Sequence, residues 1–471
     1  MSHMMMRSRF AIASALRTAG VTLAVVGGLL SPLAFADSPT FDCDVCDFSL
    51  ACDASNCDEL RCGCDGIPDC GCDQLGGCVC DTHANCLTEL GCLGTTRRNL
   101  ADSGITFQSN ITQFYFGTVS GGLDQTDRYG GHGDYVANFD LGKLGLHEGT
   151  FVKIRAEHRF GQSIVEPSGA FLPATLATEL PTTEDRNLHL TNFVITQALS
   201  ENFIVFAGKM DTLDGDMNAF AHGRGITQFS NVGFVANPIA LRTIPYASLG
   251  AGFAWVMEGE PVFSFLLMNP TDTATSSGFD ELFSDGVAIS VEARVPTNFG
   301  GLPGHQLFAG TYSTRDYVSL GQDPRIVLPD VAIARASDSW SLYWNTDQYL
   351  HTDRNDPSRG WGYFARAGIA DDSANPLGYF LSAGIGGNSQ LRGRDADTFG
   401  LGYYYSGTSD EIGPLIAAAV GGVGDGQGVE AYYSIQATQH LAITPDVQWI
   451  SQARESVDDA WLIGMRANLA F

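Results

Sequence analysis

Hydrophobic and polar residues alternate along many short segments of the chain from about Gly104 to its end. Side chains of a β-strand point to opposite faces in turn, so this pattern predicts strands with one apolar and one polar face. In one segment, charged and apolar residues alternate. The charged residues of one face are Lys153, Arg155, Glu157 and Arg159, and the apolar residues of the other are Val152, Ile154 and Ala156. The polar faces of later segments carry Glu292, Arg294, Glu430 and Arg466. Charges on strand after strand favour a barrel that surrounds water.

Sixteen segments show features of a membrane-crossing strand. They lie near residues 104–117, 131–142, 149–160, 186–199, 202–210, 247–258, 261–269, 284–296, 304–317, 337–350, 360–370, 377–387, 396–407, 428–438, 440–451 and 460–471. Sixteen strands enclose an aqueous channel, whereas eight would be filled by side chains. The expected fold class is therefore an all-β, transmembrane, antiparallel β-barrel of about 16 strands, with a small Cys-rich segment before it.

The final segment carries the clearest barrel pattern. Its apolar face ends on the terminal residue: Trp461, Ile463, Met465, Ala467, Leu469 and Phe471. Gly464, Arg466 and Asn468 occupy the opposite face. A C-terminal Phe that closes an apolar strand resembles the signature by which the outer-membrane assembly machinery recognises its substrates. An exposed edge this apolar would promote aggregation in a soluble protein, and a closed barrel has no such edge.

The connections between the predicted strands differ in length at the two ends of the barrel. Those after even-numbered strands are generally short, as at Ser200-Glu201, Gly259-Glu260 and Gln439. Several after odd-numbered strands are long: 161–185, 211–246, 318–336 and 408–427. Outer-membrane barrels have short periplasmic turns and longer external loops. An even strand count then places both ends of the barrel chain at the periplasmic side.

The first 36 residues have the features of a signal peptide. Three basic residues (Arg7, Arg9 and Arg17) come before or at the start of an apolar stretch, 19–30, and Ala34-Phe35-Ala36 offers a small-x-small cleavage site. Nothing downstream reaches the roughly 20 apolar residues of a membrane-spanning helix. The mature protein can therefore cross a membrane only as a closed barrel.

The charge of the chain is strongly negative and unevenly distributed. The formal net charge is −27, and the whole chain has only three lysines, Lys143, Lys153 and Lys209. Residues 93–471 carry 22 basic and 41 acidic residues. Nucleic-acid binding needs clustered Lys and Arg, so no nucleic-acid partner is expected. A lysine-ringed pore for phosphate is equally unfavoured.

All twelve cysteines fall within an acidic segment, 37–92, which a linker (93–103) joins to the barrel (104–471). They are Cys43, Cys46, Cys52, Cys57, Cys62, Cys64, Cys70, Cys72, Cys78, Cys80, Cys86 and Cys92. An even number of cysteines in an exported chain favours disulfides over the alternative, metal capture by thiolates. Neither the connectivity nor interchain bonding to a neighbour or envelope partner can be deduced from the spacing. We expect the segment to be periplasmic and disulfide-linked.

Three stretches resemble a known family, the carbohydrate-selective porins of the OprB type. They are Ala207–Thr212, Gly393–Gly402, and Glu430–Ile435 with Leu441–Ile450. The likeness spans about 104–471, leaves out the Cys-rich segment, and lacks a Pro before Gly393. It implies a sixteen-stranded porin through which sugars and small hydrophilic solutes diffuse, embedded in outer-membrane lipid and without a cofactor.

The connection 211–246 is the first candidate for a selectivity element. It contains Asp211, Asp214, Asp216, Arg224 and Arg242. One hypothesis is that it folds inward as a constriction where opposing Asp and Arg bind sugar hydroxyls. The alternative is an external lid on the rim. The charged residues of the strands named above are the further pore-lining candidates, and no metal site is expected.

Three functional classes follow from these patterns. A porin for carbohydrates, or a general non-selective porin, is the leading interpretation. The second is a structural envelope barrel crosslinked through its cysteines, and a homo-oligomer stays open. An enzyme is not expected, because the chain has no Gly-x-Ser-x-Gly elbow, phosphate loop or paired-His motif.

Overall fold

The computed structural model describes residues 70–72, 78–80, 91–321, 334–354, 356, 359–412 and 421–471. The predicted signal peptide and most of the Cys-rich segment lie outside these residues. The chain divides into two units, residues 37–106 and the barrel from Phe107 to Phe471. Among the described residues, no helix has the length and apolarity to cross a membrane.

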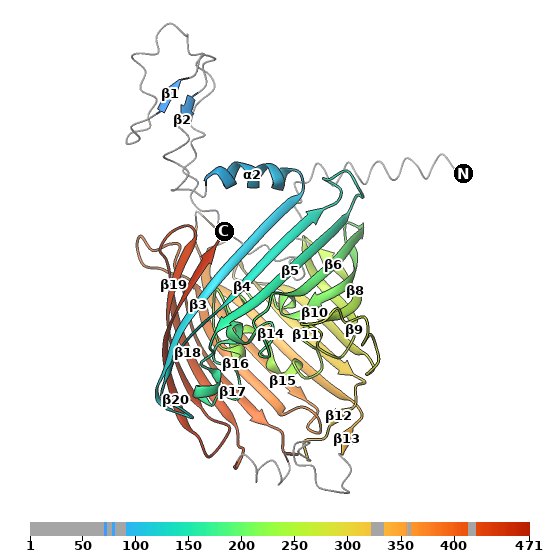
Figure 1. The fold of residues 1–471 in the computed structure, drawn as a ribbon, viewed down its shortest axis with the longest axis vertical. Helices are drawn as coiled ribbons and strands as arrows, with labels where there is room; N and C mark the ends of the chain where they lie inside the picture. Colours follow the sequence, from blue (N-terminus) through green and yellow to red (C-terminus); the bar gives the residue numbers. More distant parts are fainter. Residues whose placement is uncertain are drawn as a thin grey trace, which may run out of the picture. The chain divides into compact units, whose positions relative to one another are not determined.

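Sixteen antiparallel strands form a closed barrel in the second unit (Figure 1). The predicted set of strands and the fold class are thus confirmed. The strands are β3 (Ile105–Gly122), β4 (Asp127–Asp140), β5 (Thr150–Gly161), β6 (His189–Ser200), β7 (Phe203–Asp211), β8 (Ala247–Met257), β9 (Glu260–Met268), β10 (Ala288–Phe299), β11 (Leu302–Ser313), β14 (Ser339–Thr352), β15 (Gly360–Ala370), β16 (Leu377–Asn388), β17 (Thr398–Thr408), β18 (Gly426–Gln436), β19 (Leu441–Ser451) and β20 (Asp458–Ala470).

The barrel closes where the last strand pairs with the first. β20 runs antiparallel to β3, with Leu469 opposite Ile111. Ser109 and Phe471 exchange two backbone hydrogen bonds, each amide donating to the carbonyl of the other residue at 2.9 Å. The apolar face of β20 points outward, since Ile463 is 52% exposed and Leu462 on the other face is fully buried. The terminal Phe therefore belongs to the seam that removes both sheet edges.

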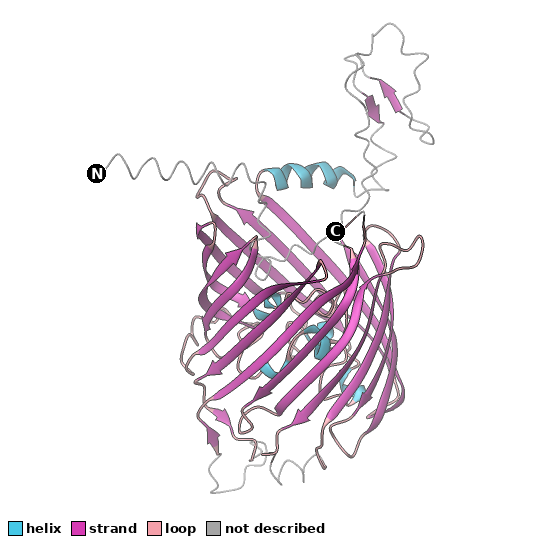
Figure 2. Ribbon diagram, turned by 180° about the vertical axis from the view of Figure 1, so that it is seen from behind, coloured by secondary structure: helices cyan, strands magenta, loops and turns pink. Residues whose placement is uncertain are grey.

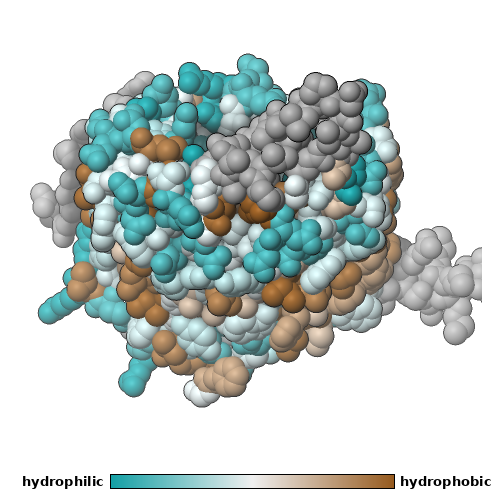
Figure 3. Space-filling model, turned by 90° about the horizontal axis from the view of Figure 1, so that it is seen from below, coloured by the Kyte–Doolittle hydropathy of each residue, from teal (hydrophilic) through white to brown (hydrophobic). Residues whose placement is uncertain are grey.

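The connections follow the expected two-sided pattern in part, since three at the end that carries the long ones (123–126, 371–376 and 452–457) are short. Short turns at 201–202, 258–259 and 437–440 lie at the end where the chain enters and leaves the barrel. The long connections 162–188, 212–246, 269–287, 314–338 and 409–425 lie at the other end, and one of them carries the small pair β12 (Tyr317–Val318) and β13 (Arg335–Ala336). Viewed from the long-connection end, the rim is mainly hydrophilic, with hydrophobic patches toward its margins (Figure 3).

The first of these short connections was expected over about 118–130 and occupies only 123–126. Gly ordinarily weakens a strand. Here the missing Cβ atoms admit neighbouring side chains. A Cβ at Gly131 would lie 2.1 Å from the ring of Phe160, and one at Gly133 would lie 2.3 Å from the ring of His158. The glycines therefore continue β4 beneath two aromatic rings from β5.

The first unit holds a short hairpin and a helix. Strands β1 (Cys70–Cys72) and β2 (Cys78–Cys80) pair with Cys70 opposite Cys80 and Cys72 opposite Cys78. The segment 93–103, expected to be a linker, is mostly helical as part of α2 (Gly91–Asp102). Arg, Leu and Ala are strong helix formers. Gly104, at φ 97°, ends the helix with its amide bonded to the carbonyl of Ala101.

Candidate permeation pathway

The long connection between β7 and β8, residues 212–246, lies inside the barrel. It contains η3 (Thr212–Gly215), α4 (Val232–Val235) and η4 (Pro238–Ala240), and the barrel strands surround these short helices in Figure 2. The connection 162–188, with α3 (Val165–Ser168) and η2 (Leu176–Glu179), joins it through the hydrogen bond from the Leu176 amide to Ser230 at 2.9 Å. We call residues 212–246 the inner loop. It occupies space that a simple sixteen-stranded barrel would leave to water.

A network of buried charges ties the start of the inner loop to β4 and β5. Arg155 lies at its centre and contacts Asp134 at 3.0 Å, Asp211 at 3.1 Å and Asp214 at 2.5 Å. Lys153 forms a further ion pair with Asp214. The alternation of β5 places Lys153 and Arg155 two residues apart on one face, where both reach η3.

A second arginine, contributed by the loop itself, completes this network. Arg224 contacts Glu157 and Asp211, each at 2.7 Å, and Asp214 at 3.1 Å. The Tyr246 hydroxyl also donates to Glu157, at 2.5 Å. Arg224 has a positive φ of 57°, which a non-glycine residue adopts at a conformational cost. The contacts of its guanidinium hold this backbone in place.

The network balances three cations against four carboxylates, all of them buried. Lys153, Arg155 and Arg224 oppose Asp134, Glu157, Asp211 and Asp214. Burial alone would raise the pKa of Asp214, but Arg155, Lys153 and Arg224 hold that pKa well below its usual range. The carboxylate therefore stays ionised at neutral pH. We call these seven residues the charge latch.

The middle of the inner loop is bound to the opposite wall of the barrel. Arg366 on β15 contacts Asp216 at 2.7 Å and donates to the carbonyl of Phe234 at 2.6 Å. Glu430 on β18 accepts from the amides of Ser230 at 2.6 Å and Asn231 at 2.9 Å. Arg466 on β20 donates to the carbonyls of Gly225 and Gln228. Polar wall residues thus satisfy loop backbone groups that would otherwise be buried without partners.

Aromatic packing adds an apolar anchor between these polar contacts. Phe229 and Phe234 of the loop lie 4.7 Å apart between ring centroids. The Phe229 ring meets Phe364 at 5.4 Å and Tyr432 at 5.0 Å, both edge-on. These wall residues sit on the interior face beside glycines, such as Gly400 and Gly402, where a Cβ would collide with the same rings. The aromatic rings of the loop therefore pack closely against the aromatic side chains and glycines of the barrel wall.

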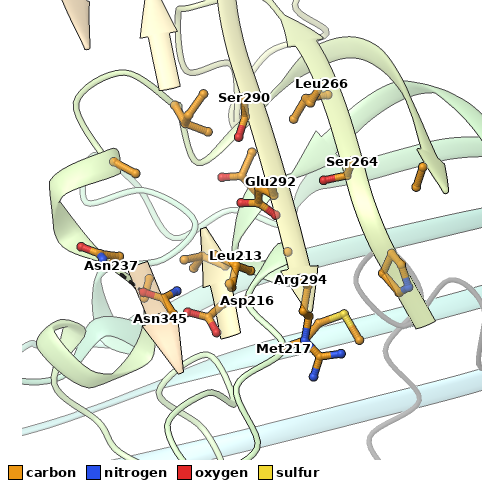
Figure 4. A pocket seen from close by; sticks show the side chains of 18 of the residues that line it. Leu213, Asp216, Met217, Asn237, Ser264, Leu266, Ser290, Glu292, Arg294 and Asn345 are labelled. Atoms are coloured by element: carbon orange, nitrogen blue, oxygen red, sulfur yellow. Dashed lines mark hydrogen bonds between the residues drawn. The ribbon is translucent and has the colours of Figure 1, made fainter. Parts of the chain in front are cut away.

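The space left between the inner loop and β7–β11 forms a cavity of about 180 Å³. We call it the inner chamber. One side is apolar, with Ile204, Phe206 and Leu266 from the strands, while Tyr343 and Asn345 come from β14. Asp216 from the loop and Glu292 and Arg294 from β10 supply charge around the same space (Figure 4). Glu292 accepts from the Tyr343 hydroxyl at 2.7 Å.

A second cavity, of about 330 Å³, lies toward the long-connection end. We call it the outer vestibule. Its lining includes Arg242, Asp272, Arg315 and Tyr317. Four loop residues line both cavities: Thr212, Leu213, Leu241 and Ile244. The two cavities therefore adjoin at these four residues, three of which are apolar. We call the four residues the waist.

The structure separates the sequence-predicted charges into two groups. Glu292 and Arg294 line the inner chamber and Arg242 lines the outer vestibule. Asp211 and Asp216 do both: they line the inner chamber and also hold the inner loop through ion pairs with wall or loop arginines. Lys153, Arg155, Glu157, Asp214, Arg224, Glu430 and Arg466 hold the inner loop and are almost fully buried. Arg159 is partly buried, and its Nη1 has no partner among the described residues. The expectation that the β5 charges face open water is thus wrong for Lys153, Arg155 and Glu157, because the inner loop covers them.

Sequence reasoning missed several contributors to these contacts. Asp134 and Arg366 lie on buried, inward faces of β4 and β15, so the alternation of these strands was the available signal. Tyr246, next to Pro245 at the end of a long connection, carried no such signal. Among the described residues, no group of His, Cys, Asp and Glu is arranged to hold a metal ion.

Comparisons with known proteins agree with this architecture. Residues 124–471 match the family described as carbohydrate-selective porin, OprB family. Porin B of Pseudomonas aeruginosa is 24% identical over 229 residues, which cover 43% of this chain and 50% of that protein. The match thus spans about half the length of this curated relative.

Solved structures of OprB from Pseudomonas putida share the fold. The high-pH structure superposes with a TM-score of 0.69 at 21% identity, covering 81% of this chain and 97% of that one. The low-pH structure gives a TM-score of 0.51 at 16% identity and covers 81% of this chain and 98% of that one. With the family match over most of the barrel, the chain belongs to the OprB family of carbohydrate-selective porins.

Proposed function

We propose that this chain is an outer-membrane porin through which carbohydrates diffuse by way of the outer vestibule, the waist and the inner chamber. The observation that carries this proposal is the pair of cavities that share Thr212, Leu213, Leu241 and Ile244. A solute entering at the long-connection end meets them in this order. Selectivity in such a pore comes from its width and the polarity of its lining.

The chemistry of the inner chamber suits a sugar. A sugar ring presents apolar C–H faces and a rim of hydroxyls. Phe206 and Leu266 offer apolar surface, while Glu292 and Asn345 offer acceptors for hydroxyl donors. Hydrogen bonds to a charged group are stronger than those between neutral groups. Glu292 is therefore the residue that we expect to hold a sugar hydroxyl during passage.

The test is single-channel recording in a planar bilayer with glucose titrated in, comparing the wild-type protein with Glu292→Gln. The substitution keeps an acceptor for the Tyr343 hydroxyl but removes the charge. We expect the half-blocking glucose concentration to rise about tenfold, as for the loss of one charge-assisted hydrogen bond. Glu281→Gln, on an exposed residue outside both cavities, is the matched control.

The results separate two kinds of porin. Glucose block that weakens in Glu292→Gln and not in Glu281→Gln supports a sugar-selective path through the inner chamber. Open channels that glucose does not block at all would contradict selectivity and leave a general diffusion porin. Block of equal strength in both variants would remove Glu292 from the path.

We also propose that the segment 37–92 lies in the periplasm and that its cysteines form disulfides. The barrel chain enters and leaves at the end with short turns, which is the periplasmic end in barrels of this class. Disulfides persist in that oxidising compartment. The segment would then be available to a second barrel or to an envelope partner.

Non-reducing electrophoresis of intact cells tests this second proposal. If the disulfides link neighbours, species of high mass should collapse to the monomer when reductant is added. If they are internal to the segment, the mass should be unchanged and a thiol reagent should label the cysteines only after reduction. Complete labelling without reduction would contradict disulfides of either kind.

A further inference from the structure

Two arginines lie against one tyrosine in the wall of the outer vestibule. The guanidinium carbon of Arg242 is 4.7 Å from the ring centroid of Tyr317, and that of Arg315 is 5.9 Å from the same centroid. Tyr317 is only 3% exposed, and its hydroxyl donates to the carbonyl of Arg242 at 3.2 Å. The buried ring therefore fixes both cationic side chains at one place on the vestibule.

Neither guanidinium is neutralised within the part of the chain that the structure describes. Arg242 donates from its Nε to the carbonyl of Ala374 at 2.9 Å, and no carboxylate of the described residues forms an ion pair with Arg242 or Arg315. Arg224 and Arg366, in contrast, each contact at least one carboxylate. Burial, together with the like charge of Arg315, lowers the pKa of Arg242, yet the group remains a cation at any physiological pH.

Among the described residues that line the vestibule, the one carboxylate is already hydrogen-bonded. Asp272 accepts from the amides of Tyr246 at 3.0 Å and Ala274 at 2.8 Å. The vestibule thus presents two guanidiniums and one hydrogen-bonded carboxylate, in a chain whose formal net charge is −27. Two like charges on one ring repel each other, and an oxyanion placed between them would relieve that repulsion.

We propose that Arg242 and Arg315 form an entry site for acidic sugars, binding the carboxylate or phosphate group while the sugar ring rests in the outer vestibule. The inference rests on the proposed permeation path, because the site lies directly before the waist. Leu241, Ile244 and Pro270 supply apolar surface beside the two arginines. Guanidinium groups bind planar oxyanions through paired hydrogen bonds, which matches this chemistry.

The test uses three blockers, glucose, glucuronate and glucose 6-phosphate, on single channels of the full-length protein at low salt. In the wild-type channel, glucuronate should block at lower concentration than glucose. Arg315→Gln should raise the half-blocking concentration of glucuronate about tenfold and leave that of glucose within about twofold. Arg242→Gln is the second variant. Arg186→Gln is the control, since Arg186 is exposed and lines neither cavity.

Retained glucose block also shows that a variant is folded and open. If glucuronate and glucose 6-phosphate both block at lower concentration than glucose, the result supports an oxyanion site. If only one of them does, the site is assigned to carboxylates or to phosphates. The inference is overturned if glucuronate blocks the wild-type channel no better than glucose does. It is also overturned if Arg315→Gln weakens block by glucuronate and block by glucose equally. If glucose does not block and glucuronate does, the neutral-sugar path fails while the entry site stands.

Discussion

Replacing residues 213–245 with an Asn-Gly turn should raise the single-channel conductance several-fold and abolish block by glucose. The ends of the inner loop are already adjacent, since Asp211 pairs with Ala247 and the Thr212 amide donates to the carbonyl of Tyr246 at 2.9 Å. A two-residue turn of this type continues an antiparallel hairpin without strain. Without the loop, the lumen should widen toward that of an open sixteen-stranded barrel.

The measurement is conductance in a planar bilayer, with and without glucose. Removal of residues 279–282 from the connection 269–287 serves as the control, because these residues line neither cavity. The control should conduct like the wild-type channel. If the loop replacement left conductance and glucose block unaltered in a folded barrel, the solute path would have to lie outside the two cavities.

Arg224→Met should produce the second largest effect, a release of the charge latch. The substitution removes a cation that contacts Glu157, Asp211 and Asp214 and leaves their buried charges under-compensated. Breaking a buried ion pair from one side costs about 3–5 kcal/mol. We expect the barrel to lose heat stability and its channels to become larger and noisier as the loop start detaches from β5.

Heat modifiability on electrophoresis and current noise in the bilayer measure these two effects. Arg186→Met, at an exposed arginine near the long-connection rim, should change neither. Arg224→Lys should fall between the wild type and Arg224→Met, since it keeps the charge but cannot reach three carboxylates with one planar group. A fully stable, quiet Arg224→Met channel would show that the loop is held by its aromatic and β15–β20 contacts alone.

The outward and inward faces of the barrel were readable from the sequence because strand alternation is local. Each of the sixteen predicted strands overlaps an observed one, and the final strand shows the expected apolar exterior. The start of β4 was placed too late because its glycines, which ordinarily weaken a strand, lie beneath rings from β5. The segment 93–103 was expected to be a linker, and it is mostly helical, in keeping with its Arg, Leu and Ala residues.

The candidate pathway was only partly predictable. The sequence pointed to the connection 211–246 and to the charged face of β5, because both carry unusual charge for their surroundings. It assigned Asp214 and Arg224 to sugar contacts, whereas the structure buries them against each other at 3.1 Å. The residues that line the outer vestibule with Arg242, such as Arg315 and Tyr317, belong to other connections and were not foreseen.

The sequence by itself determined the barrel, its strand number and, in strands with clear alternation such as β20, which residues face outward, since a period of two is set by neighbouring residues. The tertiary structure alone decided which charges hold the inner loop and which line the cavities. Arg224 meets Glu157 across 67 positions of the chain, and Arg466 meets Ser230 across 236. Partners so distant are chosen by how the loop packs inside the closed barrel, and no local pattern encodes that choice.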